Sequence, residues 1–103
     1  PRLGVLQDVH WSAGLFGYFP TYSLGNIYSA ELHAALRRAV PDLDGLLAIG
    51  ELRPVFDWLR DNIHLRGRLL SPRALIAATC GHEPTEAALL DYLERKYRAL
   101  YRL

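Results

Sequence analysis

The side chains of this 103-residue chain that are suited to act on a reacting group lie close to its start. His10, Tyr18 and Tyr22 supply an imidazole and two phenolic hydroxyls within a short stretch. Groups of this kind donate hydrogen bonds to a developing oxyanion or to a substrate carboxylate. Elsewhere the sequence suggests no nucleophile, general base or metal-binding cluster. The pattern therefore predicts part of an active site whose other half lies outside this chain.

Each candidate also has a structural interpretation. A lone histidine is more often a satisfied loop residue than a functional one, and residue type alone favours that role for His10. Tyr18 and Tyr22 stand four residues apart, so they would share one helix face that could belong to the core. Cys80 and His82 could bind a metal, but two ligands are weak evidence, and a buried thiol is the favoured interpretation of Cys80.

Hydrophobic spacing predicts the elements that position these residues. Residues 1 to about 17 are rich in glycine and show no helical period, so we expect them to be irregular. The rest of the chain shows apolar stripes at i, i+3 and i+4, punctuated by proline and glycine. We expect an all-α fold of four or five helices, over residues 21–40, 42–49, 52–66, 71–79 and 85–101. In the last of these, we expect Leu89, Leu90, Leu93, Tyr97, Leu100 and Tyr101 to face inward, and Asp91–Arg95 and Glu94–Arg98 to form ion pairs.

Composition limits the possible partners. The formal net charge is +1, and acidic and basic residues are interspersed. No basic surface is therefore expected that would bind nucleic acid or a membrane surface. No apolar run approaches the length of about 18 residues that a transmembrane helix needs. The single cysteine, Cys80, excludes an internal disulfide framework and fits a reducing cytoplasm.

Two blocks of sequence carry a family resemblance. The segment 4–11, with Gly4, Gln7, Asp8, His10 and Trp11 at fixed spacing, resembles the Gly-x-x-Gln-Asp-x-His-Trp signature of the carboxypeptidase Taq family of zinc metallocarboxypeptidases. Residues 17–25 resemble the segment that follows it there. The resemblance continues through 58–59, 62–64, 67–68 and 92–97, and departs at 79–83, where the family has Thr-Gly-Glu. It implies that residues 1–103 form a single helical unit, the C-terminal part of a larger metallopeptidase catalytic domain.

The resemblance implies a role for each candidate. In the family, zinc is held by a His-Glu-x-x-His helix and a downstream glutamate, and that motif does not occur in this sequence. The metal ligands and the general base are thus expected outside this chain, which alone should bind no catalytic zinc and cleave nothing. By analogy with related helical zinc peptidases, His10 with Tyr22 or Tyr18 would share the oxyanion charge. One of the tyrosines could also grip the terminal carboxylate of a peptide substrate.

Asp8 and Gln7 have expected roles beside these donors. Asp8 could hold the His10 ring through Nδ1–H and favour one tautomer, as carboxylates beside functional histidines do. Gln7 could contact the substrate backbone. We expect Gln7, Asp8 and Tyr22 to line the substrate-binding side of the site, although spacing alone does not decide which of them faces the cleft.

The intact protein is expected to be a cytoplasmic homodimer that releases C-terminal amino acids from peptides. Because the chain has no methionine and reaches the motif almost at once, we interpret it as a fragment. An alternative is a non-catalytic helical binding module that has lost the metal-binding half, with its aromatic faces serving as an interface. Self-association of an isolated fragment through such faces is a third possibility.

Overall fold

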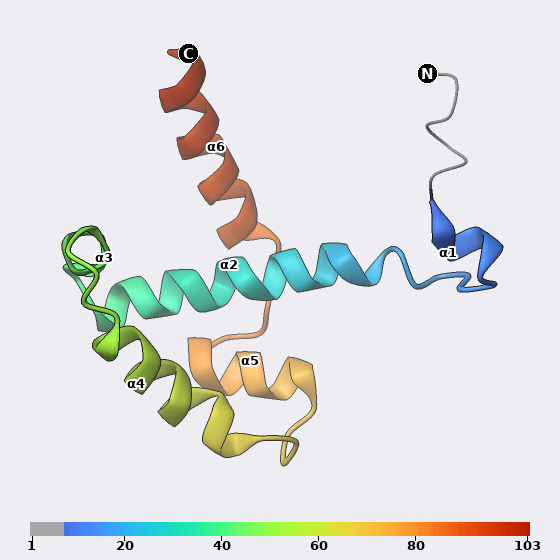
Figure 1. The fold of residues 1–103 in the computed structure, drawn as a ribbon, viewed down its shortest axis with the longest axis horizontal. Helices are drawn as coiled ribbons and strands as arrows, with labels where there is room; N and C mark the ends of the chain where they lie inside the picture. Colours follow the sequence, from blue (N-terminus) through green and yellow to red (C-terminus); the bar gives the residue numbers. More distant parts are fainter. Residues whose placement is uncertain (1–7) are drawn as a thin grey trace.

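The structure is a computed structural model that describes residues 8–103 (Figure 1). Its helices are α1 (Val9–Ser12), α2 (Thr21–Ala39), α3 (Leu43–Ala48), α4 (Arg53–Asn62), the 3₁₀ turn η2 (His64–Arg66), α5 (Pro72–Cys80) and α6 (Ala87–Tyr101). No strand occurs in this part of the chain. The predicted all-α fold is confirmed. The α-helices that follow the N-terminal segment are the five from α2 to α6, in agreement with the prediction of four or five.

The N-terminal segment is less irregular than its composition suggests. Residues Val9–Ser12 form the short helix α1, where no helix was predicted. Asp8 is its N-cap, and its carboxylate accepts a hydrogen bond from the backbone N–H of His10 at 2.8 Å. A helix of one turn is too short to show a hydrophobic period, so only this capping residue could have indicated it.

The longer helices begin and end where proline, glycine and capping residues predict. The α2 helix stops at Ala39, ahead of Pro41, because the residue before a proline is driven out of the helical region. The α5 helix starts after Ser71, whose hydroxyl accepts a hydrogen bond from the N–H of Ala74 at 3.3 Å. It ends at Gly81, which adopts a left-handed conformation with φ of 87°.

The α2 helix is the central element of the fold and contacts both α5 and α6. Figure 1 shows α5 running beneath it, α6 rising away from its middle and α1 lying beyond its start. A small core between α2 and α5 contains Ala35, Ile76 and the buried thiol of Cys80, with Tyr28, Leu32 and Trp58 packed against it. Burial raises the pKa of Cys80, as expected for a thiol withdrawn from water. The structural interpretation of this cysteine is confirmed.

The α6 helix departs from its prediction. Leu89 and Leu93 are half-buried, but Leu90, Tyr97 and Leu100 are exposed. Only the first turns of α6 lie against α2, and the remainder extends past every other element (Figure 1). The expected inward face therefore exists as a stripe, but beyond the first turns of α6 it has no partner within residues 8–103. Tyr101 belongs to the same exposed stripe.

One of the two expected ion pairs on α6 forms. Arg98 donates to the carboxylate of Glu94 at 2.8 Å. Arg95 instead donates to the backbone carbonyl of Asp91 at 3.2 Å, so the second pair is absent. A guanidinium this exposed gains little from a surface carboxylate, because the charge attraction is screened and both side chains lose freedom.

The chain exposes more surface than a self-contained domain of its mass. Its accessible area is 8156 Å², whereas a folded monomer of this mass exposes about 5,900 Å². Its radius of gyration is 17.1 Å, against about 13 Å for a compact domain of this length. Much of the exposed surface is apolar, as on α6. None of the helices in residues 8–103 combines the length and apolar character needed to cross a membrane.

Candidate active site at the start of α2

The loop between α1 and α2 folds back and brings His10 to the first turn of α2. Gly14 and Gly17 have φ values of 72° and 78°, a conformation that other residues adopt only with strain. The N–H of Leu15 bonds to the carbonyl of His10 at 2.8 Å and closes the turn. Because of these reversals, residues twelve apart in sequence, His10 and Tyr22, come into contact.

Asp8 holds the imidazole of His10 on one side. Its Oδ1 lies 2.6 Å from His10 Nδ1 and also accepts the backbone N–H of His10. These two hydrogen bonds, the backbone one foremost, lower the pKa of Asp8. A carboxylate that stays ionised keeps the proton of the imidazole on Nδ1 and leaves Nε2 available. The expected contact between Asp8 and the ring is present in the structure.

Tyr22 lies on the opposite side of the same ring. Its hydroxyl is 3.5 Å from His10 Nε2, at the outer limit of a hydrogen bond. A ring that donates Nδ1–H to Asp8 presents a neutral Nε2 as acceptor, so Tyr22 is the donor in that state. When Nε2 is protonated, both Nε2–H and the tyrosine hydroxyl become donors directed to the same region. Tyr22 is 54% exposed, which leaves this region open to a substrate.

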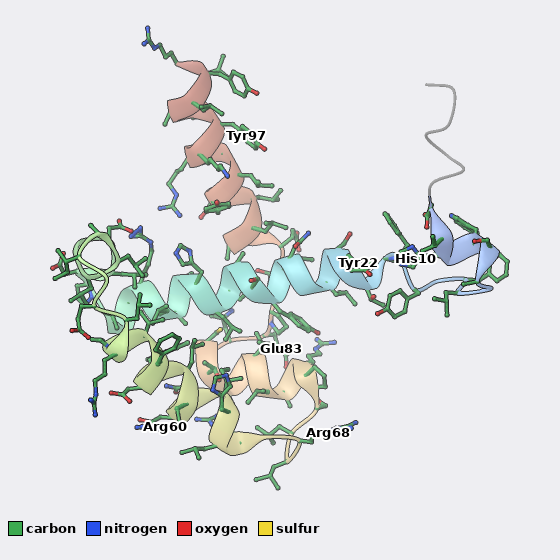
Figure 2. The ribbon with its side chains drawn as sticks, viewed as in Figure 1. His10, Tyr22, Arg60, Arg68, Glu83 and Tyr97 are labelled. Atoms are coloured by element: carbon green, nitrogen blue, oxygen red, sulfur yellow. The ribbon has the colours of Figure 1, made fainter. Side chains whose placement is uncertain are left out.

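Aromatic rings also pack against His10. The ring of Tyr18 stacks on the imidazole at a centroid distance of 5.6 Å, and Phe19 meets it edge-on at 5.5 Å. Tyr18 therefore touches the face of the ring, whereas the Tyr22 hydroxyl approaches its nitrogen. Sequence reasoning missed Phe19, although its place between the two tyrosines was a usable signal. Figure 2 shows His10 and Tyr22 close together where α2 begins.

The remaining candidates lie elsewhere. Gln7 falls outside the described residues. His82, at the C-terminal side of α5, lies 3.5 Å from the buried carboxylate of Glu31, which belongs to α2. Sequence reasoning gave Glu31 no role, yet it is 2% exposed and its Oε1 accepts the N–H of Thr85 at 3.0 Å.

Between residues 8 and 103, no group of three or more His, Cys, Asp and Glu side chains is placed to hold a metal ion.

Comparison with known proteins defines the class. Residues 1–97 match the family model described as carboxypeptidase Taq (M32) metallopeptidase. The chain therefore belongs to this family of metallocarboxypeptidases.

Particular relatives fit the same assignment. The chain is 47% identical to thermostable carboxypeptidase 1 of Thermus thermophilus over 98 residues, which are 95% of this chain and 19% of the relative. It is 43% identical to carboxypeptidase 1 of Bacillus subtilis over 97% of this chain and 20% of the relative. A solved chain described as "BsuCP Crystal Structure" superimposes with a TM-score of 0.85 at 42% identity, over 94% of this chain and 20% of that chain. The chain thus spans about a fifth of the length of the relatives it matches.

Proposed function

We propose that this chain is the C-terminal portion of a zinc-dependent carboxypeptidase that releases C-terminal amino acids from peptides. The observation that carries the proposal is the arrangement around His10, whose Nδ1 is bound by Asp8 while Nε2 faces the Tyr22 hydroxyl. Two donors that converge on one open region suit a carbonyl oxygen that gains negative charge as water attacks. Family membership supplies the reaction class.

In this proposal His10 and Tyr22 stabilise the transition state. A protonated His10 donates Nε2–H to the oxyanion, and Asp8 compensates the positive charge of the imidazolium. The hydroxyl of Tyr22 donates to the same oxygen or to the terminal carboxylate of the peptide. The Tyr18 ring supports the imidazole from its face. Removal of one such donor typically lowers the rate by about 10²–10³-fold.

The other half of the site belongs to the rest of the enzyme. We propose that the zinc ligands and the general base lie in the part that precedes this chain, and that residues 1–103 complete the same catalytic domain. Zinc in the intact enzyme would polarise the scissile carbonyl. The 103-residue chain alone would be inactive. We further propose a cytoplasmic homodimer for the intact enzyme, and self-association for the isolated chain through its exposed apolar surface.

The test uses the intact enzyme that contains this chain. Stoichiometric zinc, release of C-terminal amino acids, and a fall in kcat/KM of about 10²–10³-fold in His10→Ala would support the proposal. His64→Ala is the matched control, because His64 is an exposed histidine in η2, which follows α4 and lies away from α1 (Figure 1). Equal losses in the two variants would contradict a role for His10 in the reaction.

One observation favours a second candidate, a non-catalytic helical binding module. The exposed stripe of α6, with Leu100 and Tyr101 at 63% and 65% exposure, is the kind of surface that binds a partner. This candidate predicts a source protein without zinc and without peptidase activity. The zinc and activity measurements on the intact protein therefore separate the two functions.

A further inference from the structure

The polar face of α2 that begins at the candidate site continues along the helix. Tyr22, Asn26, Ser29 and His33 are spaced i, i+4, i+7 and i+11, so they lie on one side of α2. Asn26, Ser29 and His33 line a cavity of about 420 Å³ together with Tyr92 of α6. The face that carries the Tyr22 hydroxyl thus leads into a groove in the angle between α2 and α6.

A second cavity extends this groove. It measures about 310 Å³ and shares His33 and Tyr92 with the first. Its remaining lining residues are Arg37, Arg95 and Lys96, so this end of the groove is basic. We call the two cavities together the α2–α6 groove, and the part lined by Arg37, Arg95 and Lys96 its basic end.

Two of the three basic side chains at this end are not paired with a carboxylate among residues 8–103. Arg37 is bound to Asp44 at 2.6 Å. Arg95 bonds only to a backbone carbonyl, and Lys96 donates to the Tyr92 hydroxyl at 3.4 Å. The ion pairs formed among residues 8–103 include neither Arg95 nor Lys96. Among residues 8–103, no carboxylate compensates their charge, and an acidic ligand would do so.

The distance from the candidate site matches a short length of peptide. Tyr22 and His33 are eleven residues apart on α2, which is about 16 Å at 1.5 Å per residue. An extended peptide advances about 3.3 Å per residue, so about five residues cover this distance. A carboxypeptidase removes only the last residue of its substrate. Only the part of the peptide upstream of the scissile bond is long enough to reach the basic end.

We propose that the α2–α6 groove is a substrate subsite that binds the upstream part of the peptide. Its basic end selects an acidic side chain about five or six residues before the scissile bond. This inference rests on the proposed carboxypeptidase function and adds a substrate preference to it. The groove would steer long acidic peptides to His10 and Tyr22 and leave short substrates unaffected.

The experiment compares three substrates of the intact enzyme that have the same last two residues. One is an N-blocked dipeptide, and the others are octapeptides with either glutamates or lysines at the fifth and sixth positions before the scissile bond. We expect kcat/KM to be about tenfold higher for the glutamate peptide at low salt, with most of the difference lost near 1 M salt, where charges are screened within about 3 Å.

A charge reversal tests the residues. Lys96→Glu should abolish or invert the preference between the octapeptides and leave cleavage of the dipeptide unchanged. Arg68→Glu is the matched control: it makes the same charge change at an exposed residue that lies after η2, away from α6 (Figure 2). This control should keep the preference, so an effect of net charge alone is separated from an effect of the groove.

The outcomes distinguish this inference from the proposed function. Equal kcat/KM for the two octapeptides, or a preference that Lys96→Glu leaves intact, would overturn the subsite while cleavage of the dipeptide still supports a carboxypeptidase. If none of the three substrates is cleaved, the carboxypeptidase function itself fails, and the subsite fails with it.

Discussion

Within residues 8–103, two histidines lie beside a carboxylate, and the two pairs are built differently. Asp8 and His10 are 2.6 Å apart, and both side chains remain partly exposed, at 26% and 19%. Glu31 and His82 are 3.5 Å apart, with a Glu31 side chain that is 3% exposed and a His82 side chain that is 50% exposed. In the first pair the carboxylate of Asp8 orients the His10 ring. In the second, the histidine is a minor partner of the carboxylate.

The difference follows from what else each carboxylate binds. Glu31 accepts the N–H of Thr85 at 3.0 Å and its hydroxyl at 3.4 Å, so α2 fastens the chain segment that leads into α6. A buried carboxylate needs such donors, because its charge is otherwise costly to remove from water. Asp8 binds within its own turn, and His10 Nε2 lies 3.5 Å from the exposed Tyr22 hydroxyl. In the proposed function the first pair acts on a ligand, whereas the second pair joins elements of the fold.

The largest expected effect distinguishes the two tyrosines beside His10. In the intact enzyme, Tyr22→Phe should lower kcat by about 10²-fold, because it removes the hydroxyl that donates to the reacting oxygen in the proposed function. Tyr18→Phe should stay within about threefold of the wild type, because stacking needs the ring and not the hydroxyl. Steady-state kinetics on one peptide measures both. Equal losses would mean that Tyr18 is also a donor and that the stacked geometry does not describe its role.

The second prediction concerns the buried pair. Glu31→Ala leaves two donors of Thr85 without their acceptor, and hydrogen bonds to charged groups contribute about 1.5–3 kcal/mol. Hydrogen exchange of the Thr85 amide in the intact enzyme should therefore accelerate by at least tenfold, and the thermal unfolding temperature should fall. Glu31→Gln keeps an acceptor oxygen and should lose less. An unchanged Thr85 exchange rate in Glu31→Ala would remove the distinction between the two pairs.

Local signals in the sequence were enough for the first pair but not for the second. Sequence reasoning anticipated the contact of Asp8 with the His10 ring but not the capping of α1, and proline or glycine marks the limits of α2 and α5. Glu31 looks like any polar residue in the middle of a helix. Its burial depends on Thr85, which is 54 residues away and returns to α2 only in the folded chain.

The α6 helix shows the same limit in another form. Periodicity identified the apolar stripe that includes Leu93 and Tyr97, but it does not tell whether a partner element is present. Leu93 meets α2 and is half-buried, while Tyr97 extends beyond it and is 44% exposed. The spacing of apolar residues within a helix determines which side of the helix is apolar. Packing depends on elements that can lie far away in the sequence, as α2 does for Leu93 of α6.

The third prediction tests whether Asp8 serves His10. Asp8→Asn should lower kcat/KM by at least about tenfold, the lower end for partners that orient functional histidines. The pKa of Asp8 lies below its ordinary value of 3.8, so the contact is complete above that pH and is lost as the pH falls through the lower, folded value. Selective labelling of histidine, followed by NMR from pH 6 to pH 2, should show the His10 signal change below pH 3.8 in the wild type. The same change in Asp8→Asn would show that another group titrates.

The smallest effect is expected at His82 and gives the sharpest contrast with His10. Half of this side chain is in water and its Nε2 is 3.5 Å from Glu31, so the pair should contribute only about 0.2–1 kcal/mol, as exposed ion pairs do. His82→Ala should thus change Thr85 amide exchange by less than about fivefold and leave kcat/KM near the wild-type value. Glu31 would still have both donors of Thr85. If His82→Ala accelerated that exchange as much as Glu31→Ala does, the histidine would be an essential member of the junction. The two pairs would then differ in their surroundings but not in how strongly each carboxylate depends on its histidine.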